Sequence, residues 1–282
     1  MTRETAADSD FLAAMAASSH ARVAAARREV HDAELLASAL ATPMPPRLRL
    51  SPQGFDLIAE VKLRSPALGA LRGKDEDVAG RVAQYAAAGA AAISVLTEPT
   101  RFDGSLEHLQ LAVRALDGRV PAMRKDFIVD PYQVMQARAV GAGGVLVILR
   151  MIPPDATAAL LDMAARLGLF VLLEAFDDSD LALAEGFLRS HQSGALAVDA
   201  PLLVGINCRD LTTLQVVPGR LEQLAAHLPR NAPRVAESGV ESAADVARLS
   251  RAGYTMALVG GALMKSADPA VTVREFLAAG RA

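Results

Sequence analysis

Short, uninterrupted apolar runs recur along the chain, and most of them end in or next to a charged or polar residue. There are eight, at residues 56–62, 91–97, 120–125, 144–149, 169–174, 202–207, 234–237 and 256–260. A run without polar alternation is typical of a parallel strand that is buried on both faces. The last residues of successive runs lie 23 to 35 positions apart. That spacing is the length of one strand–helix unit.

Amphipathic segments with helix start and stop signals separate the runs. One helix is expected over 75–88, ended by Gly89. Ser242 with Asp245 resembles a capping box, and Asp268-Pro269 is a cap followed by proline at the first helical position. Eight such units predict a (β/α)₈ TIM barrel. A doubly wound sheet is the alternative, although about six strands would normally suffice for it.

The first 50 residues precede the first apolar run. Residues 11–40 are alanine-rich with helical spacing, and Pro43, Pro45 and Pro46 follow. We therefore expect an N-terminal helical extension over 1–50, made of one or two helices packed on the barrel, and a catalytic barrel domain over 51–282. Residues 190–200 are expected to form a loop insertion.

Composition limits the possible partners and surroundings. The chain has 282 residues, 52% hydrophobic and 22% charged, with net charge −3 and 4% aromatic residues. This balance suits a globular core and argues against nucleic acid as a partner. Cys208 is the one cysteine, so no intramolecular disulfide is possible. Without a signal peptide or a stretch of about 18 apolar residues, we expect a cytoplasmic protein and no membrane span.

Ionisable and polar side chains follow the ends of the apolar runs, where a barrel forms its active site. They are Glu60, Lys62, Thr97, Glu98, Lys125, Asp126, Glu174, Asn207, Arg209, Glu237 and Ser238. Two lysines, four glutamates and an arginine on one rim predict acid–base chemistry; rim salt bridges without chemistry are the alternative. No histidine lies at a run end, so neither a histidine base nor a histidine metal site is expected. Cys208 is expected to pack beside the site rather than act as a nucleophile.

Glycines after the last two runs predict a phosphate site. Ser238-Gly239 follows the seventh run, and Gly260-Gly261 follows the eighth and opens a short helical segment. Main-chain N–H groups at such a place bind anions, and barrels often hold a phosphate there. An ordinary glycine-rich turn is the alternative.

Several of these motifs, in this order, resemble the indole-3-glycerol phosphate synthase family. The resemblance spans about residues 10–280 and rests on IAEVK at 58–62 with Ser65-Pro66, ISVLTE at 93–98, RKDFI at 124–128, Leu173-Glu174, GIN at 205–207 with Arg209-Asp210-Leu211, AESG at 236–239 and Val259-Gly260 with Leu263-Met264.

The resemblance implies a phosphorylated small-molecule substrate, 1-(o-carboxyphenylamino)-1-deoxyribulose 5-phosphate. The family closes its ring and releases CO₂ and water to form indole-3-glycerol phosphate in tryptophan biosynthesis, with no metal or organic cofactor. Catalysis is expected from Lys125 as the acid, with Glu174, Glu60 and Lys62 dividing the remaining proton transfers in an order left open. Substrate binding is expected from Ser65, Phe127, Leu146, Asn207, Arg209 and Glu237. Phosphate binding is expected from Lys62, Ser238, Gly239, Gly260 and Gly261.

The chain also departs from the family pattern. The departures are Leu63, Arg64, Ala67, Phe176, Cys208 and Gly261. None removes an expected catalytic residue, but several surround the loop after the first run. The alternatives are therefore a diverged paralogue for a substituted anthranilate substrate, another phosphosugar barrel such as an isomerase or Schiff-base aldolase, and a catalytically silent barrel. A monomer or weak homo-oligomer is expected.

Overall fold

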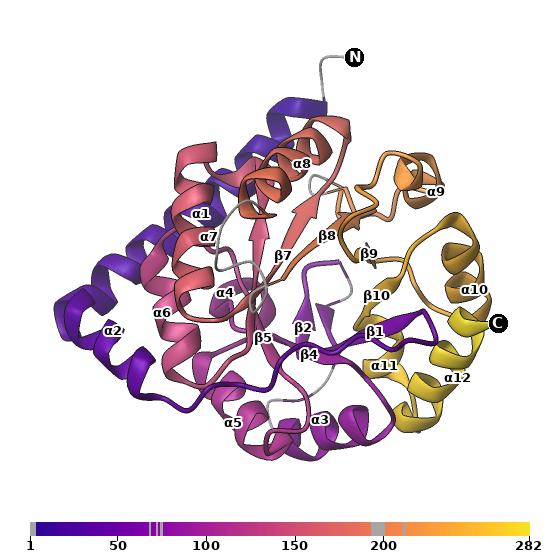
Figure 1. Ribbon diagram of the computed structural model, residues 1–282, viewed down its shortest axis with the longest axis horizontal. Helices are drawn as coiled ribbons and strands as arrows, with labels where there is room; N and C mark the ends of the chain where they lie inside the picture. The colour runs from indigo at the N-terminus through magenta and orange to yellow at the C-terminus, as the bar shows by residue number, and fades with distance from the viewer. Residues whose placement is uncertain (1–3, 68, 72, 74–75, 193–200, 211–212) are drawn as a thin grey trace.

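The computed structural model describes residues 4–67, 69–71, 73, 76–192, 201–210 and 213–282 (Figure 1). In these ranges eight parallel strands close into a barrel, in the order β1-β10-β9-β8-β7-β6-β5-β4. Their bounds are β1 Asp56–Val61, β4 Ala92–Leu96, β5 Ala122–Lys125, β6 Gly144–Ile148, β7 Phe170–Ala175, β8 Leu202–Asn207, β9 Arg234–Glu237 and β10 Met256–Val259. Each strand lies within or overlaps one predicted run. The TIM-barrel prediction is confirmed, and the doubly wound alternative is wrong because the sheet closes.

Helices connect the strands and cover the outside of the barrel. They are α3 Val78–Ala87, α5 Leu106–Leu116, α6 Pro131–Ala139, α7 Pro154–Arg166, α8 Asp178–Gln192, α9 Arg220–Ala225, α10 Ala243–Ala252 and α12 Pro269–Arg281, with the shorter α4 Pro99–Phe102, η1 Leu149–Met151 and α11 Gly261–Lys265. The predicted start signals are confirmed. Ser242 and Asp245 form a reciprocal capping box on α10, and Asp268 caps α12 ahead of Pro269. The insertion expected at 190–200 falls mainly on residues outside the described ranges.

After β1 the chain forms a small hairpin, which the hydrophobic pattern does not predict. Its strands are β2 Arg64–Ser65 and β3 Gly69–Ala70, and they pair antiparallel. This hairpin brings Ser65 to the C-terminal rim of the barrel.

The N-terminal extension forms two helices, α1 Glu4–Glu29 and α2 Asp32–Ala41. They lie along one side of the barrel beside α6 and α7 (Figure 1). Arg27 Nη2 lies 2.7 Å from Asp130 at the start of α6, and the Tyr132 hydroxyl donates to the carbonyl oxygens of Ala26 and Val30. An extended segment then leads into β1.

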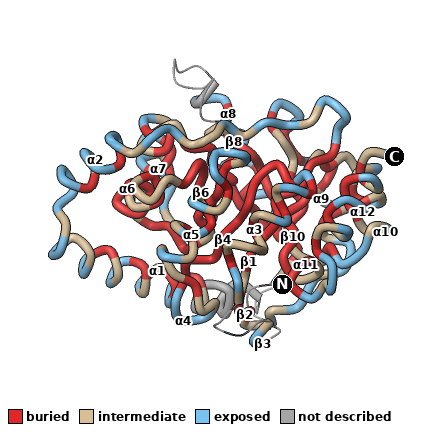
Figure 2. The backbone as a smooth tube through the Cα atoms, turned by 90° about the horizontal axis from the view of Figure 1, so that it is seen from below, coloured by how far each residue is buried: buried red, intermediate tan, exposed pale blue. Residues whose placement is uncertain are grey.

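Two apolar layers hold the strands in place. One cluster lies inside the barrel and includes Ile58, Met123, Phe170 and Leu203. The larger cluster lies between the strands and the surrounding helices. Figure 2 shows the strands as buried chain with exposed positions confined to the periphery. Burial on both faces explains why the strand sequences lack polar alternation and fixes the positions of the strand ends.

Candidate active site

A pocket opens at the C-terminal ends of the strands and collects most of the predicted site residues. Those that line it are Glu60, Lys62, Ser65, Lys125, Phe127, Glu174, Asn207, Arg209, Glu237, Ser238, Gly239, Gly260 and Gly261. Leu146 does not line it: it lies inside the barrel, and Ile148, two residues further along β6, lines the pocket instead. Alternate residues of a strand share a face, so Leu146 is on the same face of β6 as Ile148 but lies deeper in the barrel.

Two ion pairs lie among the residues that line the pocket. Lys62 Nζ donates to Glu60 Oε1 at 2.7 Å, and Lys125 Nζ lies 3.7 Å from Glu174 Oε2. Burial disfavours the charge of Lys125, but the surrounding carboxylates, Glu174 first, outweigh it and raise the pKa of this lysine well above its usual value. Burial likewise opposes ionisation of Glu60, yet Lys62 and the neighbouring cations lower its pKa. At neutral pH the pocket therefore holds a protonated Lys125 and an ionised Glu60.

Glu237, at the end of β9, is a further acidic side chain in the pocket, beside Glu60 and Glu174. Its side chain is buried, and among the described residues neither of its oxygens has a hydrogen-bond partner. Burial and the neighbouring Glu174 carboxylate raise the pKa of Glu237 well above its ordinary value. The site thus contains a carboxyl group that holds its proton more tightly than a free glutamate does.

The raised pKa of Glu237 predicts how stability changes with pH. A carboxyl group whose pKa is higher in the folded state stabilises the fold at low pH, and this contribution is lost as the pH rises through the folded-state pKa. Glu237→Gln stays neutral, so its melting temperature relative to the wild type should increase between about pH 5 and about pH 9. Thermal unfolding across that range measures the difference. The exposed Glu275→Gln serves as control, and a pH-independent difference for Glu237→Gln would contradict the expectation.

Two glycines leave room for these carboxylates. A Cβ atom on Gly260 would lie 2.3 Å from Glu60 Oε1, and one on Gly205 would lie 2.1 Å from Glu237 Oε1. Both separations are below van der Waals contact. Glycine is therefore needed here for close approach to the carboxylates.

Asn207 and Arg209 extend from the end of β8 into the same pocket. Asn207 Nδ2 donates to Glu174 Oε1 at 3.1 Å, and its Oδ1 accepts from the main-chain N–H of Arg209 at 2.9 Å. Arg209 Nη1 donates to the carbonyl oxygen of Leu214 at 2.6 Å. These contacts orient the Glu174 carboxylate and hold a guanidinium at the pocket wall.

The predicted phosphate-binding residues lie together at one end of the pocket. Ser238 and Gly239 have φ of 66° and 69°, and Gly260 immediately precedes α11. Cys208 packs beneath this turn and lies outside the pocket lining, with Sγ 3.3 Å from the carbonyl oxygen of Ser238. Burial raises the pKa of the Cys208 thiol, which agrees with a packing role.

An aromatic wall faces these polar groups, and sequence reasoning missed most of it. Phe11 of α1 meets Phe127 edge-on, with ring centroids 5.9 Å apart, and Phe102 of α4 lies 6.2 Å from Phe127. All three rings line the pocket. Phe11 reaches it only through packing of the extension on the barrel, for which no local sequence signal exists.

Three of the polar strand-end residues serve other purposes. Glu98 accepts from the main-chain N–H groups of Thr100 and Arg101 and so caps α4, while Thr97 and Asp126 point away from the pocket. The expectation that four glutamates converge is therefore wrong for Glu98. Proline directly after Glu98 was the available signal for a cap.

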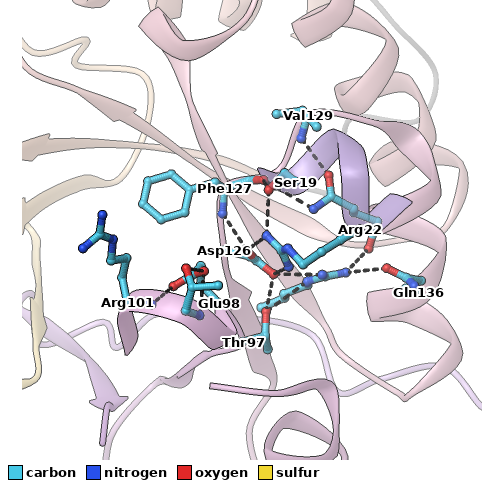
Figure 3. Close-up of polar contacts among 12 residues, drawn as sticks. Ser19, Arg22, Thr97, Glu98, Arg101, Asp126, Phe127, Val129 and Gln136 are labelled. Atoms are coloured by element: carbon cyan, nitrogen blue, oxygen red, sulfur yellow. Dashed lines mark hydrogen bonds and ion pairs between the residues drawn. The ribbon is translucent and has the colours of Figure 1, made fainter. Parts of the chain in front are cut away.

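A buried polar cluster joins the N-terminal extension to β5 and the loop that follows it (Figure 3). This cluster, the Asp126 cluster, consists of Ser19, Arg22, Thr97, Arg124 and Asp126. The Asp126 carboxylate accepts from Arg22 at 2.8 and 3.1 Å, from Arg124 at 2.9 Å and from Thr97 at 2.7 Å. Burial opposes its charge, but both arginines hold the pKa of Asp126 far below its usual range.

The Asp126 cluster lies directly beside the pocket residues. Asp126 stands between Lys125 and Phe127 in the chain, and Ser19 Oγ of α1 donates to the Phe127 carbonyl oxygen at 2.5 Å. Arg22 also donates to Ser19 Oγ at 2.7 Å. The extension therefore fixes the backbone that carries two pocket residues.

Arg22→Met should weaken both the fold and the pocket. Methionine keeps the apolar stem but removes the bonds to Asp126 and Ser19, so the free energy of unfolding should fall by about 1–3 kcal/mol. Because Phe127 is then held less firmly, we expect KM for the substrate to rise by about threefold to tenfold. Chemical denaturation and steady-state kinetics measure the two effects. The exposed Arg28→Met in the same helix is the control, and an unchanged KM in Arg22→Met would refute the link.

Together, the closed parallel barrel and its rim of lysines, carboxylates and glycine turns define a (β/α)₈-barrel enzyme with an acid–base site. The indole-3-glycerol phosphate synthase family model matches residues 12–276. Curated proteins of that name are 42% identical over 252 residues in Leifsonia xyli subsp. xyli, covering 89% of this chain and 91% of the relative, and 39% identical over 263 residues in Mycobacterium leprae, covering 92% and 91%. This chain belongs to the indole-3-glycerol phosphate synthase family.

Solved structures of low identity share the fold. The 3-hexulose-6-phosphate synthase from Salmonella typhimurium superposes with a TM-score of 0.58 at 14% identity, covering 80% of this chain and 98% of that one. The thiamine phosphate pyrophosphorylase from Pyrococcus furiosus gives 0.55 at 16%, covering 81% and 96%. None of the helices in the described ranges has both the length and the hydrophobicity to span a bilayer.

Proposed function

We propose that this chain catalyses the reaction of its family, the conversion of 1-(o-carboxyphenylamino)-1-deoxyribulose 5-phosphate into indole-3-glycerol phosphate, CO₂ and water. This reaction belongs to tryptophan biosynthesis. The observation that carries the proposal is Lys125, kept protonated by the nearby Glu174 and Glu60 carboxylates in the same pocket as the Lys62–Glu60 pair. We also propose that the enzyme is cytoplasmic and that it is a monomer or weak homo-oligomer. We propose no nucleic-acid or membrane partner for it.

Ring closure requires a proton at the substrate ketone. The aromatic carbon that bears the carboxylate attacks the ketone carbon, and the ketone oxygen takes a proton from Lys125 as the new carbon–carbon bond forms. The carbon–carboxylate bond then breaks, CO₂ leaves, and the electron pair returns to the ring. A lysine held in its charged form is suited to the first step because it both donates the proton and stabilises the developing oxyanion.

Dehydration requires a second acid and a base. The hydroxyl group leaves as water after protonation, and a proton is removed from the adjacent carbon to form the indole double bond. Glu60, ionised and paired with Lys62 at 2.7 Å, and Glu174, next to Lys125, are the groups proposed to share these transfers. Lys62 is the alternative acid.

The remaining pocket residues are proposed to bind the two ends of the substrate. Ser65, Asn207 and Arg209 are proposed for the carboxylate, and Glu237 for the polar middle of the molecule. The ring is proposed to lie against Phe127, with Ile148 in place of Leu146. The phosphate is proposed to accept from main-chain N–H groups at Ser238, Gly239, Gly260 and Gly261, with Lys62 nearby.

A fluorescence assay with the carboxyphenylamino-deoxyribulose phosphate tests the function directly. We expect indole fluorescence to increase at a rate proportional to enzyme concentration. Tight substrate binding without turnover would overturn it in favour of a silent barrel or a substituted anthranilate substrate, for which ring-substituted analogues are then assayed. Borohydride trapping of a phosphosugar on a lysine would instead indicate a Schiff-base aldolase.

A further inference from the structure

A second pocket lies at the end of the barrel opposite the candidate active site. Residues 46–51 of the segment before β1 form one wall, and the loops that precede β4 and β5 form the others. In Figure 1 this segment runs from α2 across the view to β1. The N-terminal ends of parallel strands lie together, so this pocket is a barrel length away from the residues of the proposed chemistry.

The lining of this pocket is strongly basic. It contains Arg47, Arg49, Arg119 and Arg281, whereas Asp56 is the only carboxylate among its lining residues in the described chain. Asp56 is buried and accepts from Arg281 Nη2 at 3.1 Å and from the main-chain N–H of Ser51 at 2.7 Å. Its charge therefore offsets that of Arg281.

Two of these arginines have no carboxylate partner within the described ranges. Arg119 donates to the carbonyl oxygens of Leu116 at 3.0 Å and Ala115 at 2.6 Å, which hold its guanidinium in place without neutralising it. Arg49 is exposed, and no described carboxylate lies within ion-pair distance of it. A positioned guanidinium and an uncompensated one thus line the same pocket.

We propose that this pocket binds a small organic polyanion that carries phosphate or clustered carboxylate groups. Guanidinium groups present paired N–H donors that match phosphate and carboxylate oxygens in a bidentate geometry. Arg49 and Arg119 place two positive charges in the lining of the same pocket, and a bound polyanion would pair with both. A cationic ligand would be repelled by these groups. This inference does not depend on the proposed function.

Isothermal titration at constant ionic strength tests the proposal, with inorganic pyrophosphate and citrate as probes. We expect saturable binding of at least one probe to the wild-type chain. In Arg49→Ala/Arg119→Ala the affinity should fall by about tenfold, and in Arg49→Ala alone by about threefold. The single variant changes an exposed side chain, so its affinity still tests the proposal even if the double variant is unstable. Turnover should be unchanged in both.

A charge-matched control separates a site from diffuse attraction. Arg166→Ala/Arg251→Ala removes two exposed arginines from α7 and α10 and should leave the affinity unchanged. Tighter binding of pyrophosphate than of citrate would indicate a phosphate ester as ligand, and the reverse a polycarboxylate. The proposal is overturned if neither probe saturates, if the control loses as much affinity as the pocket variants, or if binding persists in Arg49→Ala/Arg119→Ala and is purely competitive with substrate.

Discussion

Replacing Lys125 by methionine is expected to lower kcat by about a thousandfold or more, with a smaller change in KM. Methionine fills similar space but can neither donate a proton nor stabilise an oxyanion. The variant also leaves Glu174 and Glu237 next to each other without the ammonium group that lies 3.7 Å from Glu174. Single-turnover fluorescence measures the loss in the chemical step itself.

The control for Lys125→Met is Arg114→Met, which removes one positive charge from the exposed face of α5. It should retain wild-type kcat. If Lys125→Met kept more than about a tenth of the wild-type kcat, another group would have to be the acid, and the role proposed for Lys125 would be refuted.

Glu60→Gln is expected to lower kcat by about a hundredfold. The amide keeps the shape of the side chain but cannot accept a proton, and it removes the charge that faces Lys62 at 2.7 Å. Because the pKa of Glu60 is lowered, the wild-type carboxylate is already ionised at neutral pH and is available as a base. The dehydration step should therefore slow more than ring closure, and a ring-closed intermediate should accumulate in rapid-quench experiments.

Glu185→Gln on α8 is the matched control for this prediction, since Glu185 is exposed and pairs only with Arg189 among the described residues. An unchanged rate of dehydration in Glu60→Gln, with Glu174→Gln strongly impaired, would assign the base to Glu174 instead.

The barrel could be predicted from sequence because each of its strands is buried on both faces. The strands β8 and β9 coincide with the predicted runs residue for residue. The β2–β3 hairpin could not be predicted in this way, because its two-residue strands are too short to show a pattern. Local periodicity reports burial by the nearest layers and says nothing about such short pairings.

The site was predictable to the extent that its residues follow strand ends. A closed barrel brings those ends together, so Lys125, Glu174 and Glu237 meet although they are far apart in sequence. The depth of a side chain was less predictable, since strand tilt decides whether Leu146 or Ile148 reaches the pocket. Contacts from the extension were not predictable, because they depend on how separately folded elements dock.

The ion pair between Arg22 and Asp126 joins residues that are 104 positions apart. At typical rates of synthesis, Asp126 leaves the ribosome about 5 to 20 s after Arg22. During that interval α1 has no Asp126 to bind and its face with Phe11 is uncovered. Glu237 and Gly260 emerge still later. The nascent protein therefore exposes Leu12, Met15 and Val23 of α1, which the finished fold buries. The carboxylates and lysines of the pocket come together only after Glu237 has been synthesised.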